Sequence, residues 1–135
     1  MTTKTLNCIM LIDDNGDDNF YHERIIKKNK AAEKVISIES AKKAIEFLRN
    51  KQNHETNHPD LIFLDINMPE MNGWEFMEEY QALDETLRSK VIVIMLTTSD
   101  NPDDKAKAKQ LGMLADFKTK PLTKEMLNEI ISKYF

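Results

Sequence analysis

LIFLDINMPEMNG, residues 61–73, is the stretch of sequence that decides the fold. Its first four residues are apolar without alternation, which is typical of a strand buried on both faces of a parallel sheet. Asp65 ends that run, and helical spacing begins at Gly73 and continues through Phe76 and Tyr80. The stretch therefore predicts a buried strand, a carboxylate at its carboxyl end and a helix that follows it.

The same alternation of apolar run and helical segment repeats along the chain. Further strands are predicted at residues 6–12, 34–38, 91–96 and, more weakly, 115–118. Helices are predicted at 17–30, after Ser40 as N-cap, from Gly73, from Pro102 to near Gly112, and at 124–134. The helix that starts at Pro102 offers mainly Ala106, Ala108 and Leu111 for burial. Five strands alternating with five helices predict an α/β fold, with an open, doubly wound parallel sheet of five strands covered by helices on both faces.

Bulk composition limits the classes of function. A chain of 135 residues forms one domain, residues 1–135, and its 41% hydrophobic residues can close a core. The net charge of -4 argues against binding nucleic acid. No run approaches the roughly 20 apolar residues of a membrane span, and the N-terminus does not read as a signal peptide. The single cysteine, Cys8, forms no internal disulfide, so a reduced, cytoplasmic setting is expected.

Polar residues follow four of the predicted strands at their carboxyl ends, which share one edge of a parallel sheet. They are Asp13 and Asp14, then Asp65, then Thr97, Thr98 and Ser99, and finally Lys120 before Pro121. Three carboxylates in one crevice either raise their pKa values or hold a cation, and such hard oxygens suit Mg²⁺. Each piece alone reads as a solvated turn or a loop boundary, but their placement at successive strand ends favours a site.

The chemistry that this set fits is phosphoryl transfer. An aspartate can act as a phosphoryl-accepting nucleophile, and a lysine supplies a compact positive charge for the transferred group. Because the reaction depends mainly on positioning and charge neutralisation, Mg²⁺ and one lysine around Asp65 are sufficient machinery.

Four segments resemble the receiver domains of bacterial response regulators: LIDD at 11–14, LIFLDINMPEMNG at 61–73, VIMLTTS at 93–99 and DFKTKPL at 116–122. The resemblance covers essentially the whole chain. It implies a flavodoxin-like three-layer sandwich with strand order 2-1-3-4-5. It also implies a two-component switch that accepts a phosphoryl group from a phosphohistidine.

The resemblance assigns the metal site residue by residue. Asp65 is the expected phosphoacceptor, and Asp14 and Asp65 are expected to bind Mg²⁺ directly. Asp13 is expected to act mainly through water, and Asn67 to add its backbone carbonyl.

The resemblance also assigns the switch. Thr97 is the expected hydroxyl that moves toward the phosphoryl group. Lys120 is expected to pair with the phosphoryl group, and the Lys120-Pro121 peptide bond is expected to be cis. Phe117 stands at the aromatic switch position, although a strand residue of the core is an equally good interpretation. Thr98, where many receivers carry Ala or Gly, is expected to narrow the entrance to the pocket.

The implied partners are a sensor histidine kinase or a histidine phosphotransfer protein, and a downstream protein target; a homodimer is a further possibility. The chain is not expected to be a turnover enzyme or to carry an effector domain. An aspartate-dependent phosphatase is disfavoured, because Asn67 stands where such an enzyme needs an acid. A receiver-like module that cannot be phosphorylated is the other alternative, and the complete set of site residues argues against it.

Three smaller expectations complete the sequence reading. Asp17 or Asp18 is expected to cap the first helix, with a second cation site as the alternative. His22, His54 and His58 lack metal-ligand spacing and are expected at the surface. The segments LRNKQNHETNHPD at 48–60 and LTTSD at 96–100 are similar to single-domain receivers that are paired with bacterial phytochrome kinases.

Overall fold

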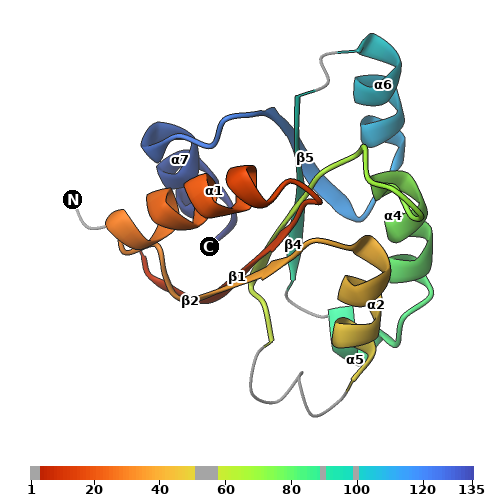
Figure 1. Cartoon of the computed structure of the whole chain (residues 1–135), viewed down its shortest axis with the longest axis horizontal. Helices are drawn as coiled ribbons and strands as arrows, with labels where there is room; N and C mark the ends of the chain where they lie inside the picture. The colour runs from red at the N-terminus through yellow and green to blue at the C-terminus, as the bar shows by residue number, and fades with distance from the viewer. Residues whose placement is uncertain (1–3, 51–57, 89–90, 99–100) are drawn as a thin grey trace.

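A five-stranded parallel sheet forms the centre of the molecule, with helices on both of its faces (Figure 1). The computed structural model describes residues 4–50, 58–88, 91–98 and 101–135. The strand order is β2-β1-β3-β4-β5, and every neighbouring pair is parallel. The predicted α/β fold and strand order are therefore confirmed.

The elements follow the predicted sequence with local differences. The strands are β1 Leu6–Ile12, β2 Ala32–Ile38, β3 Leu61–Leu64, β4 Ile92–Thr97 and β5 Leu114–Thr119. The helices are α1 Gly16–Lys28, α2 Ala41–Arg49, α4 Gly73–Gln81, α5 Glu85–Arg88, α6 Pro102–Gln110 and α7 Lys124–Tyr134.

Two of the differences lie around the first crossover and one lies before β4. Helix α1 ends at Lys28, two residues before the predicted end, and Lys30 adopts a positive φ of 53°, which no helix continues through. Strand β2 starts at Ala32, two residues earlier than predicted. The short helix α5 was not predicted, because four residues are too few to show a periodic pattern.

The core has two layers, one on each face of the sheet. Helices α1 and α7 cover one face and helices α2, α4 and α6 cover the other (Figure 1). Along β1, Ile9 and Leu11 belong to the first layer, whereas Met10 and Ile12 belong to the second. This double burial explains why the strands are apolar without alternation.

Asparagines cap the two helices that lie next to the carboxyl edge of β1 and β3. The Asn15 side chain accepts hydrogen bonds from the backbone N–H groups of Asp17 and Asp18, at 3.0 and 3.1 Å, so the prediction of an aspartate cap is wrong. Those aspartates lie in the first turn, where their charge complements the helix dipole. Asn72 forms a capping box with Glu75 at the start of α4.

Helix α6 is the least firmly packed of the longer helices within the described ranges. Ala108 is its one buried residue, Leu111 is half-buried just beyond its end, and Ala106 is exposed, contrary to expectation. The Nζ of Lys107 lies 4.9 Å from the centre of the Trp74 ring on α4. This cation–π contact joins the outer faces of α4 and α6. In the part of the chain that is described, no helix has the length and apolar character needed to cross a bilayer.

Candidate functional site

Three carboxylates meet at the carboxyl ends of β1 and β3. Oxygen atoms of Asp13, Asp14 and Asp65 lie within 4.8 Å of one another. Asp65 is only 7% exposed and Asp13 is also buried, while Asp14 lies at the exposed rim. The crevice forms where β1 has neighbours on both sides, because the chain crosses from β2 to β3 on opposite sides of it. The predicted convergence of these residues is therefore confirmed.

Asp13 is held on all sides by hydrogen bonds. Its backbone N–H donates to the carbonyl of Ile38 at 3.2 Å, and its Oδ1 accepts from the N–H of Asn15 at 2.9 Å. Its carbonyl accepts from Nδ2 of Asn19 at 2.8 Å. The carboxylate is thereby fixed in direction before any ligand arrives.

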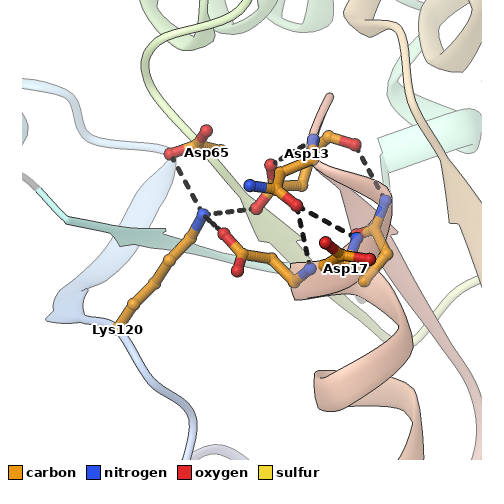
Figure 2. A network of polar contacts seen from close by, with 7 residues as sticks. Asp13, Asp17, Asp65 and Lys120 are labelled. Carbon is orange, nitrogen blue, oxygen red and sulfur yellow. Dashed lines mark hydrogen bonds and ion pairs between the residues drawn. The ribbon is translucent and has the colours of Figure 1, made fainter.

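Lys120 lies among these carboxylates, and Figure 2 shows its side chain reaching between Asp65 and Asp13. Its Nζ donates to Asp13 Oδ2, lies 2.8 Å from Asp18 Oδ2, and is 3.8 Å from Asp65 Oδ1. Burial alone would lower the pKa of Lys120, but the hydrogen bonds to Asp13 and Asp18 raise it above its ordinary value. Lys120 therefore stays charged in the site.

Asp18 is a member of the site, whereas the sequence predicted that it caps the first helix, with a second cation site as the alternative. It lies in the first turn of α1 and forms an ion pair with Lys120. The signal was its position in the first turn of the helix that follows β1, close to the edge of the sheet where Asp13 and Asp14 lie. Asp17 lies in the same turn (Figure 2).

The electrostatics of Asp65 show why the crevice suits a cation. Burial, followed by the nearby charge of Asp13, raises the pKa of the Asp65 carboxyl to about 6. Lys120, the N–H of Ile66 and the Thr97 side chain oppose this rise without cancelling it. A divalent cation among the carboxylates would remove the repulsion, and their hard oxygens fit Mg²⁺. The residues present therefore fit the metal that the sequence implied.

The switch candidates line the side of the site formed by β4 and β5. Thr97 ends β4 fully buried, and its carbonyl accepts a hydrogen bond from the N–H of Lys120 at 2.8 Å. The Lys120-Pro121 peptide bond is cis, as expected. Phe117 is half-buried on β5 and packs against the layer that contains α4 and α6, so both of its interpretations remain open. Thr98 is exposed beside Thr97, and Ser99 lies outside the described residues.

Gly73 packs directly against the backbone of Asp65 and Ile66, a role that its place at the start of a helical pattern did not reveal. Its N–H donates to the carbonyl of Ile66 at 2.8 Å. A Cβ at this position would lie 2.5 Å from the backbone oxygen of Asp65, too close for any real contact. Glycine is therefore required so that α4 can begin next to Asp65.

The histidine predictions need correction. His22 is only 3% exposed and lies on the buried face of α1, whereas surface placement was expected. Burial, followed by the charge of Lys120, lowers its pKa, so its ring is neutral at physiological pH. His58 is half-buried, and His54 lies outside the described residues. Asn67, expected to offer its carbonyl, is exposed in the loop after β3.

Comparison with known proteins agrees with this geometry. Residues 9–132 match the family model described as the response regulator receiver domain. The chain belongs to this receiver family. It is a receiver of two-component signalling, and its Asp13, Asp14 and Asp65 form the acidic cluster of the site.

Three related proteins place this receiver more closely. A crystal structure of a two-component response regulator from Cytophaga hutchinsonii is 33% identical, with a TM-score of 0.87 over 97% of this chain and 98% of that one. The rice (Oryza sativa subsp. japonica) two-component response regulator ORR1 is 30% identical over 84% of this chain, which spans about half (49%) of that protein. The phosphorylated cyanobacterial phytochrome response regulator RcpA is 27% identical, with a TM-score of 0.74 over 96% and 91% of the two chains. The predicted similarity to phytochrome-associated receivers is therefore confirmed, although residues 51–57 of the segment that suggested it lie outside the described ranges.

Proposed function

We propose that Asp65 accepts a phosphoryl group from the phosphohistidine of a sensor kinase or of a histidine phosphotransfer protein. The observation that carries this proposal is the meeting of Asp13, Asp14 and Asp65 with the charged Lys120 at one edge of the sheet. The similar receiver RcpA has been crystallised in a phosphorylated form, which supports the same chemistry here.

In the proposed reaction an Asp65 carboxylate oxygen attacks the phosphorus and the phosphorus–nitrogen bond breaks. The electron pair of that bond stays on the histidine nitrogen, and the ring leaves as a neutral imidazole because its other nitrogen carries a proton taken from solvent. Asp13, Asp14, Asp65 and the Asn67 carbonyl would hold Mg²⁺. When bound, the ion supplies neutralisation of the charge that spreads over the phosphoryl oxygens. Asp13 is already fixed by its hydrogen bonds, so it needs little rearrangement to take part.

Lys120 has a second role in this proposal. In the structure its Nζ is closer to Asp13 and Asp18 than to Asp65. A phosphoryl group on Asp65 would bring new negative oxygens toward Nζ and compete with Asp18 for it. Lys120 then pairs with the phosphoryl group, and its backbone link to Thr97 connects that pairing to β4.

Output is proposed to pass through Thr97 and Phe117 to the face formed by α6, β5 and α7. Phosphorylation would shift an existing equilibrium between two arrangements of this face, and a downstream protein would bind one of them. The receiver would therefore act as a cytoplasmic switch rather than a turnover enzyme, and this face would also be the contact surface of any homodimer.

Incubation with Mg²⁺ and acetyl phosphate, followed by intact mass measurement, tests the proposal. We expect one added phosphoryl group on the wild type and on the control Asp116→Asn, and none on Asp65→Asn. Continued hydrolysis of sugar phosphates would support a phosphatase instead. A wild type that reacts neither with acetyl phosphate nor with candidate kinases would support the alternative of a receiver-like module that cannot be phosphorylated.

A further inference from the structure

The buried face of helix α1 is unusually polar. Its buried residues are Asn19, His22 and Ile26, and two of these three are polar. A helix that packs on a sheet normally presents an apolar stripe, so buried polar residues are the informative exception. Asn19 and His22 are three residues apart and therefore occupy neighbouring positions on one face of the helix.

Asn19 makes one specific contact with the site. Its Nδ2 donates to the backbone carbonyl of Asp13 at 2.8 Å, and the side chain is only 4% exposed. Its Oδ1 is buried and has no hydrogen-bond partner among the described residues. A buried acceptor without a partner opposes folding, so packing alone would favour an apolar side chain here.

Both polar residues lie directly behind the carboxylates. A cavity of about 10 Å³ is bounded by Asn19, His22, Asp13 and Asp65 together with apolar residues of β1, β3 and β4. Asn19 and His22 of α1 therefore lie beneath the acidic crevice. The lining of this cavity includes an amide and an imidazole beside its apolar side chains.

We propose that Asn19 is a positioning residue for the metal site, and this inference rests on the proposed function. Its amide holds the Asp13 carbonyl while Ile38 holds the Asp13 N–H, so the Asp13 carboxylate is aimed at the crevice from a fixed backbone. His22 borders the same cavity. Groups that orient metal-binding carboxylates in this way contribute to metal affinity without touching the ion.

The test compares two asparagines of the same helix region. Asn29 donates from Nδ2 to the carbonyl of Ile25 at 2.8 Å, the same kind of bond at the same distance, at the far end of α1. In titration calorimetry with Mg²⁺, we expect Asn19→Leu to weaken binding about tenfold and Asn29→Leu to change it by less than about twofold. Asn19→Ser, which is too short to reach the Asp13 carbonyl, should weaken binding in the same direction and serves if the leucine variant does not fold.

The thermal unfolding midpoint without Mg²⁺ separates positioning from a purely structural role. We expect the midpoint of Asn19→Leu to stay close to that of wild type, because leucine removes the buried Oδ1 that has no partner as well as the hydrogen bond to Asp13, while its Mg²⁺ affinity falls. Equal Mg²⁺ affinity of wild type and both folded Asn19 variants would overturn the inference and leave the proposed function intact. A wild type that binds no Mg²⁺ would overturn the proposed function itself, and the inference with it.

Discussion

Asp65 carries two opposing demands. Burial and the charge of Asp13 disfavour its ionised form, but the proposed chemistry needs a carboxylate nucleophile. The site resolves this with Lys120 at 3.8 Å and with room for a cation between three carboxylates. A cation bound between these carboxylates would therefore favour the ionised form of Asp65.

Replacing Asp65 by asparagine should therefore stabilise the protein in the absence of Mg²⁺. The folded-state pKa of about 6 lies above the ordinary 3.8, so the folded protein binds this proton more tightly than the unfolded chain. That contribution to stability is present below pH 3.8 and is lost as the pH rises through about 6. We expect Asp65→Asn to gain on the order of 3 kcal/mol at neutral pH, because the pKa rises by about two units and each unit is worth about 1.4 kcal/mol.

Urea denaturation in the presence of a chelator, at neutral pH and near pH 4, measures this effect. The gain should shrink toward zero at the lower pH, and Mg²⁺ should reverse it at neutral pH by binding the wild type more tightly. A variant that is less stable than wild type at both pH values would contradict the account of Asp65.

Gly73 offers a second prediction at the scale of single residues. In Gly73→Ala the new Cβ would meet the Asp65 carbonyl oxygen at 2.5 Å, so α4 or the loop that contains Asp65 must move. We expect a loss of about 1–3 kcal/mol of stability and slower phosphorylation by acetyl phosphate. Gly112→Ala is the matched control, because a Cβ there meets nothing within 4 Å. Equal effects of the two changes would refute the close-packing argument.

The sequence predicted well which strand-end residues meet at the site, and it predicted poorly the residues that support them. The site residues lie at the carboxyl ends of strands, so a parallel sheet brings them together. They are Asp13, Asp14, Asp65, Thr97 and Lys120. Asn19 and His22 gave no such signal, because polar residues in a helix usually face solvent and their burial depends on how α1 is rotated. The N-cap was misassigned for a related reason, since Asn15, Asp17 and Asp18 are all good caps and backbone geometry decides among them.

Helix α6 is weakly held: its sequence offers few apolar residues, and the structure buries only Ala108 of them within the helix. It buries Ala108 and contacts α4 through Lys107 and Trp74. Because α4 begins at Gly73 against Asp65, this contact connects the segment around Asp65 to α6. Local stability of a helix with so few buried contacts should be low.

The change Lys107→Met should loosen α6 by removing the charge over the Trp74 ring. An exposed cation–π contact contributes about 0.5–1 kcal/mol, so amide exchange across residues 102–110 should become several-fold faster. Trp74 is the single tryptophan of the chain, and its fluorescence should change as well. Lys109→Met is the control. Lys109 is on the same helix but lines a pocket between α6 and β5, so its replacement should leave Trp74 emission unchanged. An unchanged exchange rate in Lys107→Met would show that the contact does not hold α6.

For the molecule as a whole, the order of elements was predictable because uniformly apolar strands alternate with amphipathic helices. Right-handed crossovers then leave few arrangements for five parallel strands. Helix α5 and the start of β2 were missed, because short elements and element ends carry little periodic signal. The fold places β1 between β2 and β3, and this position creates the crevice in which the acidic residues meet.

The central claim is that Asp65 is the residue that receives the phosphoryl group. Reaction with acetyl phosphate and Mg²⁺, reduction with borohydride and peptide mass mapping test it most directly, because borohydride converts a phosphorylated aspartate into homoserine. The account predicts homoserine at position 65 and at no other aspartate. Homoserine at Asp13 or Asp14 with Asp65 intact would contradict it.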